Sequence, residues 1–503
     1  MSMPSSLTTG PADLRSPISL HVPRLADFRP ADTSTLISPV VVRGCLRFAE
    51  LALIAAIGLL VAALYVPEED AFGTPAYLIA VGAVGLAAVT ILESLGLYAP
   101  PALTAPARSI PRLLLGWTSA AALLVTVVFF LKIGPDFSRV WLALWYLVAG
   151  LALVVGRFLV ALLTRRWARQ GRLNRRAVIY GSGEECRRLI AALESDAESD
   201  IRICGVFDDR GGDRRPAMVS GYPTLGRLED LVALSRKTRV DLVIMAMPMK
   251  AESRIVALLE RMFVMPVDIR LAALVSKLRL RPRAYSFIGS VPMLDLHDKP
   301  IRDWGGVAKW AFDKLIGGAA LILLAPLMAA VAVAIRLESR GPALFRQKRY
   351  GFNNELIEVF KFRSMYTDMA DVDATKLVTR DDPRVTRVGR FIRRTSIDEL
   401  PQLFNVAIGN LSLVGPRPHA MQAKAADKLY DEAVDGYFAR HKVRPGITGW
   451  AQINGWRGET DTEEKLRKRI EHDLYYIENW SLMLDAYILL RTPLALLKAE
   501  NAY

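Results

Sequence analysis

Four long apolar stretches in the first third of the chain constrain its fold more than any other feature. They cover residues 48–66, 76–98, 113–131 and 140–163. Each approaches the roughly 20 residues that a helix needs to cross the hydrocarbon core of a bilayer. We therefore predict a bundle of four transmembrane helices over residues 41–165.

The charges that flank these stretches predict their orientation. Arg43 and Arg47 precede the first stretch, and Arg108 and Arg112 separate the second from the third. The loop after the first stretch is the acidic "PEED", whereas six arginines follow the fourth in "TRRWARQGRLNRR". Because basic flanks stay in the cytoplasm, both ends of the bundle are expected there. Four buried helices of a soluble core, the alternative, leave this alternation unexplained.

The composition agrees with a membrane protein that handles anions. Of 503 residues, 52% are hydrophobic, and the net charge is +14. The basic charge suits an anionic membrane surface or phosphate-bearing partners. A nucleic-acid-binding protein is disfavoured, because no helix-turn-helix or RNA-binding signature accompanies the charge. The three cysteines match no metal or redox spacing, and residues 1–40, without an apolar run, predict a disordered tail and not a signal peptide.

A different pattern follows over residues 175–275. "RAVIYGSG", "IRICGVFDD", "VDLVIMAMP" and "MPVDIRLA" are typical of buried strands, and "ECRRLIAALES" and "AESRIVALLERMF" of the helices between them. Alternation of this kind predicts a parallel sheet in a Rossmann-like α/β domain, placed at residues 166–300. "GSGEEC" after the first strand is open to two interpretations, a nucleotide-binding loop or a tight turn, because Cys186 stands where a third glycine is expected.

A fifth apolar run, "LIGGAALILLAPLMAAVAVAI" at 315–335, is long enough to span a membrane. Pro326 lies in its middle, and both of its flanks are basic, so a full crossing would place one basic cluster outside. We expect a helix over residues 309–337 that is broken at Ala325-Pro326 and enters and leaves by the cytoplasmic leaflet. A proline-kinked fifth span is the alternative.

The segment "RRTSIDELPQLFNV", residues 393–406, contains adjacent carboxylates. Ser396 and Glu399 have the spacing of a capping box. Pro401 instead favours a helix that starts at the proline and ends near Gly409, which places Asp398 and Glu399 just before its N-terminus. One carboxylate could then face a reacting phosphorus while the other holds a metal. The surrounding arginines, glycines and prolines of residues 336–460 suit phosphate-binding loops, or else a solvated basic face.

At this point a resemblance adds detail. "RQKRYGFNNELIEVFKFRSM", "RRTSIDELPQLFNV", "LVGPRPH" and "RPGITGWAQINGWRGET" resemble the bacterial sugar transferase family, the polyprenol-phosphate phosphoglycosyl transferases with one re-entrant membrane helix. The whole chain is similar to their large form, with four membrane helices, a Rossmann-like (CoA-binding-like) domain and an α-rich catalytic domain at residues 301–503. It is most similar to undecaprenyl-phosphate glucose phosphotransferases. Ala325-Pro326 departs from the Ser-Pro that is frequent in relatives.

The resemblance implies a reaction and its residues. Asp398 is expected to attack the sugar-bearing phosphate of a UDP-sugar and release UMP, while Glu399 helps to bind Mg²⁺. Undecaprenyl phosphate then takes the phosphosugar from the enzyme, which is the first membrane step of exopolysaccharide or capsule synthesis. The implied substrate-binding residues are Lys361, Arg363, Arg394, Arg417, Arg444, Pro445 and Gly446.

Several expectations concern partners and location. The resemblance places the chain in the bacterial inner membrane as a multi-pass protein with a cytoplasmic catalytic domain, in contact with membrane lipids, and the middle domain offers a surface for a homodimer. Helical patterns in residues 462–499 suit helices in the lipid interface or packing on the domain. Glucose is the expected hexose, with galactose or an N-acetylhexosamine as alternatives. A non-catalytic membrane scaffold or sensor is the competing class of function.

Overall fold

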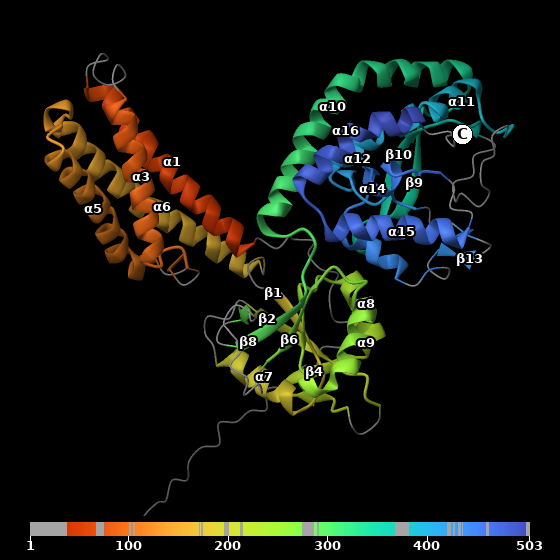
Figure 1. The fold of residues 1–503 in the computed structure, drawn as a ribbon, viewed down its shortest axis with the longest axis horizontal. Helices are drawn as coiled ribbons and strands as arrows, with labels where there is room; N and C mark the ends of the chain where they lie inside the picture. Colours follow the sequence, from red (N-terminus) through yellow and green to blue (C-terminus); the bar gives the residue numbers. More distant parts are fainter. Residues whose placement is uncertain are drawn as a thin grey trace, which may run out of the picture.

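The computed structural model describes residues 38–66, 75–99, 102–103, 106–170, 172, 175–195, 201–211, 215–273, 286–288, 291–367, 382–419, 424–425, 428–430, 434, 436–458 and 462–498. The predicted tail lies outside these residues except for its last three positions. Pro39 and Val40 of that range already belong to the first helix. Three bodies are visible in Figure 1: a helical bundle, an α/β domain and the C-terminal region that is expected to be catalytic, which a long bent helix borders.

A helix occupies each of the four predicted apolar stretches, and each helix is long and apolar enough to cross a membrane. They are α1 (Pro39–Tyr65), α3 (Ala76–Ser94), α5 (Pro106–Phe130) and α6 (Arg139–Arg169), and α1 packs against α3 and α6 while α5 also contacts α3 and α6. α1 and α5 begin before their apolar stretches and α6 continues past the end of its stretch, because the polar turns there continue the helical hydrogen bonding, whereas α3 ends at Ser94, four residues before its stretch does. Trp117, Trp141 and Trp145 fill the centre of the bundle, whereas leucines such as Leu64 and Leu151 are exposed on its outside. Such an apolar exterior is what a lipid environment requires.

A buried ion pair fastens the bundle. Arg157 of α6 lies 3.0 Å from the Glu50 carboxylate of α1, and the Tyr98 hydroxyl donates to that carboxylate at 2.6 Å. Arg157 also donates to the Leu97 carbonyl at 2.8 Å. Paired charges of this kind are tolerated among membrane helices when their partners are internal. The pair therefore holds α1, α6 and the end of α3 in one register.

The middle domain has a mostly parallel sheet with helices on its faces (Figure 1). Its elements are β1 (Arg175–Tyr180), α7 (Glu184–Glu194), β2 (Ile201–Phe207), β3 (Met218–Val219), β4 (Tyr222–Gly226), α8 (Leu228–Lys237), β5 (Leu242–Met245), a 3₁₀ turn (Met249–Ala251), α9 (Glu252–Met262), β6 (Asp268–Ala272), β7 (Ser286–Ile288) and β8 (Val291–His297). The strand order is β3-β4-β2-β1-β5-β6-β8-β7. The four predicted strands and both helices are confirmed.

The edges of this sheet were not predicted. β8 pairs antiparallel with β6, and the short β3 pairs antiparallel with β4. These strands carry few consecutive apolar residues because one or both of their faces are accessible, so their sequence lacks the buried-strand pattern.

The loop after β1 is bound internally. Asp208, at the end of β2, accepts hydrogen bonds from the Ser182 amide at 2.7 Å and the Ser182 hydroxyl at 2.6 Å. Arg210 pairs with the same carboxylate at 2.8 Å. Gly181 has φ +106°, and a Cβ there would lie 2.8 Å from the Ala246 carbonyl oxygen. These contacts favour the tight-turn interpretation of "GSGEEC", because the polar groups that would meet a nucleotide already have protein partners.

The fifth apolar run forms one long helix, α10 (Asp303–Glu338), with Pro326 inside it. The expected break at Ala325-Pro326 is therefore wrong in one respect: the helix bends without being interrupted. Proline removes one backbone donor and pushes against the preceding turn, which bends a helix whose remaining hydrogen bonds persist. Figure 1 shows the two arms of α10 running in different directions around the catalytic elements.

The catalytic region contains short strands and helices inside this bend. They are β9 (Leu344–Tyr350), a 3₁₀ turn (Phe352–Asn354), β10 (Leu356–Phe362), α11 (Arg387–Arg394), a 3₁₀ turn (Ile397–Glu399), α12 (Gln402–Ile408), β11 (Ser412–Val414), β12 (Lys424–Ala425), β13 (Lys428–Leu429), a 3₁₀ turn (Tyr437–Lys442), β14 (Gly446–Thr448), α14 (Trp450–Ile453), α15 (Glu463–Glu478) and α16 (Leu482–Lys498). A further 3₁₀ turn, Gly134–Asp136, joins α5 to α6.

A buried polar network anchors α10 to this region. Lys309 donates to the Asp485 carboxylate of α16 at 2.6 Å and to the Val414 carbonyl of β11 at 3.0 Å. One turn further, Asp313 accepts from the Ser412 hydroxyl at 3.0 Å. Buried charges must be paired and hydrogen-bonded to be tolerated. The network therefore fixes the first arm of α10 at one position against β11 and α16.

Candidate active site

The acidic pair lies on a short turn between two helices. α11 ends at Arg394, Ser396 takes a left-handed conformation (φ 59°), and the 3₁₀ turn Ile397–Glu399 leads to Pro401. α12 then ends at Gly409, which has φ +107°. The predicted proline start and glycine end of this helix are confirmed. The capping box is absent, because Ser396 makes no side-chain cap and instead accepts a hydrogen bond from Arg457 at 2.5 Å.

Glu399 is bound by two cations. Arg417 donates from Nη1 to Oε2 at 3.0 Å and from Nη2 to Oε1, and Lys361 Nζ donates to Oε1 at 3.0 Å. The Glu399 side chain is only 13% exposed. Burial by itself raises its pKa, but Arg417 and Lys361 outweigh burial and hold the pKa well below its usual range. Glu399 is therefore a fixed negative charge that orients two cations.

Asp398 has the opposite environment. The side chain is half-buried, and no side chain that the structure describes donates a hydrogen bond to it. Burial raises the pKa of Asp398 to about 6; Lys361 lowers it and Glu399 raises it. The nearby cations do not keep the pKa of this carboxyl low, because burial has the larger effect. Above pH 7 the group is an ionised carboxylate without hydrogen bonds, which suits a nucleophile.

Further arginines lie near the acidic pair, and the sequence did not identify them as site residues. Arg349 and Arg457 interact electrostatically with Glu399 and Asp398, and burial lowers the pKa of Arg349 to about 10. Arg393, rather than the exposed Arg394, lies close enough to lower the pKa of Asp398. Arg349 and Arg457 stand inside motifs that were recognised, in "RQKRYG" and "WRGET". The position of Arg349 and Arg457 inside these motifs was therefore a signal by which the sequence could have identified them as site residues.

Arg363, an expected phosphate ligand, is placed elsewhere. Its guanidinium donates to the Ser339 carbonyl at 2.8 Å, the Arg340 carbonyl at 2.7 Å and the Thr367 hydroxyl at 2.9 Å. These carbonyls belong to the C-terminal end of α10, where four backbone acceptors lack helical partners. Because the guanidinium is buried on those acceptors, the geometry gives Arg363 a structural role, capping α10.

The Arg444-Pro445-Gly446 loop also acts through its backbone. The Pro445 carbonyl accepts from Ser412 N at 2.9 Å, and Gly446 N donates to the Pro416 carbonyl at 3.0 Å. A Cβ on Gly446 would lie 2.1 Å from the Gly415 amide nitrogen, so glycine is required for this approach. The loop positions the segment that carries Arg417.

Arg444 is exposed. It lines a separate cavity of about 320 Å³ together with Lys299 and Lys442. The expected nucleotide contact of this arginine is therefore not supported by its placement. His419 and His441, left out of the expected catalytic set, are both buried; His419 Nδ1 lies 2.9 Å from the Tyr437 hydroxyl. Structural histidines have this environment.

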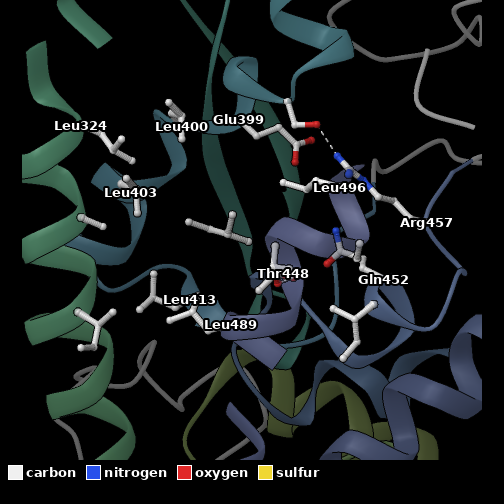
Figure 2. Close-up of a pocket in the computed structure, with 17 residues that line it drawn as sticks. Leu324, Glu399, Leu400, Leu403, Leu413, Thr448, Gln452, Arg457, Leu489 and Leu496 are labelled. Carbon is white, nitrogen blue, oxygen red and sulfur yellow. Dashed lines mark hydrogen bonds between the residues drawn. The ribbon is translucent and has the colours of Figure 1, made fainter. Parts of the chain in front are cut away.

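A cavity of about 260 Å³ opens beside Glu399 (Figure 2). Ser396, Glu399, Gln452 and Arg457 give it a polar side. Its remaining walls are almost entirely apolar and come from α10, α12, β11, β14 and α16. Two polar atoms here, Arg457 Nη1 and Gln452 Oε1, are buried and have no hydrogen-bond partner among the residues that the structure describes. Since buried polar atoms are normally paired, they mark a place where a ligand group fits.

The carboxylates of the acidic pair are candidate ligands for a magnesium ion. No group of three or more His, Cys, Asp or Glu side chains in the described part of the chain could hold a metal. Mg²⁺ needs less, since one or two carboxylates together with substrate phosphates and water suffice. Glu399 Oε2 accepts one hydrogen bond, from Arg417, and keeps a lone pair. The donor set thus fits a magnesium ion that arrives with a phosphate substrate.

Two known families match the chain. Residues 304–499 match the bacterial sugar transferase family, and residues 93–273 match a CoA-binding domain. The first match contains the acidic pair and every element around it. The second begins at the end of α3 and covers the parallel sheet.

Named relatives resemble most of the chain. The undecaprenyl-phosphate glucose phosphotransferase of Komagataeibacter xylinus is 43% identical over 333 residues, which is 66% of this chain and 61% of that protein. The UDP-glucose:undecaprenyl-phosphate glucose-1-phosphate transferase of Escherichia coli K12 is 37% identical over 381 residues, 76% of this chain and 80% of that protein. The undecaprenyl-phosphate galactose phosphotransferase of Salmonella typhimurium LT2 is 30% identical over 390 residues, 73% and 77% respectively. This chain therefore belongs to the bacterial sugar transferase family.

Proposed function

We propose that this chain transfers glucose-1-phosphate from UDP-glucose to undecaprenyl phosphate, with release of UMP, at the start of exopolysaccharide synthesis. The observation that carries the proposal is the acidic pair: Asp398, to which no described side chain donates a hydrogen bond, stands next to Glu399, whose carboxylate binds Lys361 and Arg417. Phosphoryl transfer depends mainly on positioning and on neutralising charge, and this arrangement supplies both. The names of the K. xylinus and E. coli relatives supply the substrates.

In the first half-reaction an Asp398 carboxylate oxygen attacks the sugar-bearing phosphorus of UDP-glucose. A new P–O bond forms to Asp398 while the P–O bond to the UMP phosphate breaks, so UMP leaves with the bonding electron pair. Lys361 and Arg417, together with Arg349 and Arg393, surround the site with positive charge. Cations placed in this way stabilise both the transferring phosphoryl group and the departing phosphate.

In the second half-reaction an oxygen of undecaprenyl phosphate attacks the same phosphorus. The bond to Asp398 breaks, the carboxylate is regenerated, and undecaprenyl diphosphate glucose is formed. A covalent intermediate lets a soluble donor and a lipid acceptor use one site in turn. Isolation of the phosphosugar adduct on Asp398 tests this covalent step.

Glu399 is the residue that would hold Mg²⁺. When bound there, the ion supplies positive charge to the donor diphosphate. Removal of divalent metals with EDTA is expected to abolish UMP release, and added Mg²⁺ should restore it. Glu399→Gln should raise the Mg²⁺ concentration needed for half-maximal activity, and an unchanged requirement would argue against this role.

Membrane placement follows from the exposed apolar side chains. Ile322 and Leu323 on the first arm of α10 and Leu337 on the second are 77%, 78% and 82% exposed. Apolar side chains on both arms of a bent helix suit a helix that dips into one leaflet and returns. The first turn of α10 also contacts the predicted cytoplasmic end of α1, where Ser38 donates to Asp303 at 2.5 Å. We place the catalytic region on the cytoplasmic face of the inner membrane.

The choice of sugar rests on similarity, because no residue of the site identifies one hexose. The galactose enzyme of S. typhimurium is also a relative, at lower identity. A donor panel of UDP-glucose, UDP-galactose and UDP-N-acetylglucosamine, with the lipid product identified by mass, decides among them. Efficient use of a donor other than UDP-glucose would contradict the glucose assignment.

Asp398→Asn tests the reaction itself. Tritium-labelled UDP-glucose, undecaprenyl phosphate and Mg²⁺ are incubated with purified protein in nanodiscs, and label in the organic phase is counted. The variant should lose at least about 1,000-fold in rate, because amide nitrogen and oxygen are poor nucleophiles. Glu358→Gln, an exposed carboxylate on β10, is the matched control. A scaffold or sensor predicts no transfer from any UDP-sugar by the unmodified protein.

A further inference from the structure

The cavity beside Glu399 has walls that suit hydrocarbon. Ile316, Ala320 and Leu324 line it from α10, and Leu489 and Leu496 from α16 (Figure 2). Uracil, ribose and glucose are polar and need hydrogen-bond partners when they are buried. The hydroxyls of Thr448 and Thr492 are the exceptions in these walls, and they hydrogen-bond to each other at 2.8 Å, so the apolar part of the cavity fits the soluble donor poorly.

The opposite side of the cavity suits an anion. Arg457 donates from Nη2 to the Ser396 hydroxyl, and its Nη1 is buried without a partner. Arg457 interacts electrostatically with Glu399 and Asp398, which places its charge close to the reacting carboxylate. A phosphate oxygen is the partner that a guanidinium N–H binds best. An anionic group on Arg457 would thus stand near Asp398.

The helices that form the apolar walls also carry apolar side chains on their outside. Leu323 of α10 and Leu490 of α16 are both exposed. Both helices are therefore apolar on their outer faces and also where they line the cavity. A molecule that satisfies the whole cavity has an anionic head and an oily tail that continues into lipid.

We propose that this cavity binds the phosphate-proximal isoprene units of the polyprenyl phosphate acceptor, with Arg457 as the residue that binds its phosphate. The inference rests on the proposed function and assigns a separate place to the second substrate. The donor phosphates lie on the Lys361 and Arg417 side of the acidic pair, and the acceptor approaches from the Arg457 side. Gln452 Oε1, the other unpaired atom, is available to accept a hydrogen bond from a protonated phosphate oxygen.

Two neighbouring alanines of α10 allow a matched test. Ala320 lines the cavity, whereas the adjacent Ala319 is exposed and is not among the residues that line it. Ala320→Phe fills the apolar space, and Ala319→Phe adds the same ring outside it. Each variant is assayed in nanodiscs for the burst of UMP release without acceptor, and then for transfer to undecaprenyl phosphate from the preloaded enzyme.

Ala320→Phe should keep the UMP burst within about twofold and slow transfer at least tenfold, while Ala319→Phe should leave both unchanged. Arg457→Gln should slow transfer at least tenfold more than it slows the burst, because the acceptor phosphate loses its ligand. An intact burst also shows that each variant is folded.

Three outcomes would overturn the inference: undiminished transfer in both Ala320→Phe and Arg457→Gln, an equal loss of both half-reactions in both variants, or the same loss with Ala319→Phe as with Ala320→Phe. Absence of the burst in the unmodified protein would instead contradict the proposed function. The two failures are therefore distinguishable.

Discussion

At the scale of single residues, the site depends on two adjacent carboxylates with different partners. Glu399 is ionised because Arg417 and Lys361 contact it, and those contacts keep it from moving. Burial raises the pKa of Asp398. None of the described side chains donates a hydrogen bond to this carboxylate, so its lone pairs are available for attack. Adjacent residues on a turn point in different directions, which allows one to organise cations while the other reacts. The division of roles comes from environment, because the two side chains have nearly the same chemistry.

The pKa of Asp398 predicts the pH dependence of UMP release. Since burial raises this pKa to about 6, the carboxyl becomes protonated and unreactive as the pH falls through 6. The rate of the burst without acceptor should be constant above about pH 7 and fall about tenfold per pH unit below 6. Measuring this half-reaction alone avoids the titration of the lipid phosphate, which lies in the same range.

The variant Lys361→Met tests whether Lys361 lowers the pKa of Asp398. Lys361 lowers the pKa of Asp398, so its removal should raise that pKa and move the midpoint of the burst to higher pH. Lys348→Met, at an exposed position on β9, serves as the control and should leave the midpoint in place. A burst rate that stays constant to pH 5, or equal midpoints in both variants, would contradict the assigned environment.

Residue types in the site were predictable, but side-chain directions were not. Asp398, Glu399, Lys361 and Arg417 come together as expected. Arg363 donates to the carbonyls at the end of α10, although Lys361, two residues before it, contacts Glu399. Sequence motifs carry composition and spacing. They do not record which distant segment packs beside each side chain, and that packing decides what the side chain binds.

At the scale of elements, α10 connects the apolar surface that is proposed to enter the membrane with the active site. Its first arm is held by Lys309 and Asp313, and its C-terminal end by Arg363. Helical periodicity and the central proline predicted the helix and its bend. The continuity of the helix through Pro326 could not be predicted, because a proline either bends or ends a helix according to the packing of the residues that follow it.

Arg363→Met separates a structural role from phosphate binding. Loss of the hydrogen bonds to the Ser339 and Arg340 carbonyls should cost about 1–3 kcal/mol of stability, seen as a lower Tm. The KM for UDP-glucose should stay within about twofold of the unmodified value in protein that remains folded. Arg346→Met, an exposed arginine on the adjacent strand, should change neither quantity. A tenfold rise in KM with an unchanged Tm would restore the phosphate role.

At the scale of the whole molecule, three bodies share one polypeptide and meet at α10. Apolar runs and charge asymmetry predicted the bundle, and strand-helix alternation predicted the parallel part of the middle sheet. The edge strands and the contacts between bodies depend on residues far apart in sequence, such as Asn353, which donates to the Ser235 carbonyl of α8 at 2.7 Å. The predicted homodimer through the middle domain stays a prediction.

Thiol labelling in whole cells tests the topology. In a background with Cys45, Cys186 and Cys204 replaced by serine, Arg302→Cys and Arg346→Cys place single cysteines on either side of α10. A helix that returns to the same face should leave both inaccessible to a membrane-impermeant reagent and reactive toward a permeant one. Lys132→Cys, between α5 and α6, should react from outside and is the positive control. Impermeant labelling at only one side of α10 would reveal a complete crossing.

Direct isolation of the covalent adduct tests the central claim. The protein is mixed with UDP-glucose and Mg²⁺ without acceptor, quenched rapidly and digested, and the peptides are fragmented in a mass spectrometer. The account predicts one peptide that gains the mass of a phosphohexose, with the added mass on Asp398, and loses it when undecaprenyl phosphate is supplied before quenching. A phosphohexose on any other side chain, or none during a measurable burst of UMP, would contradict it.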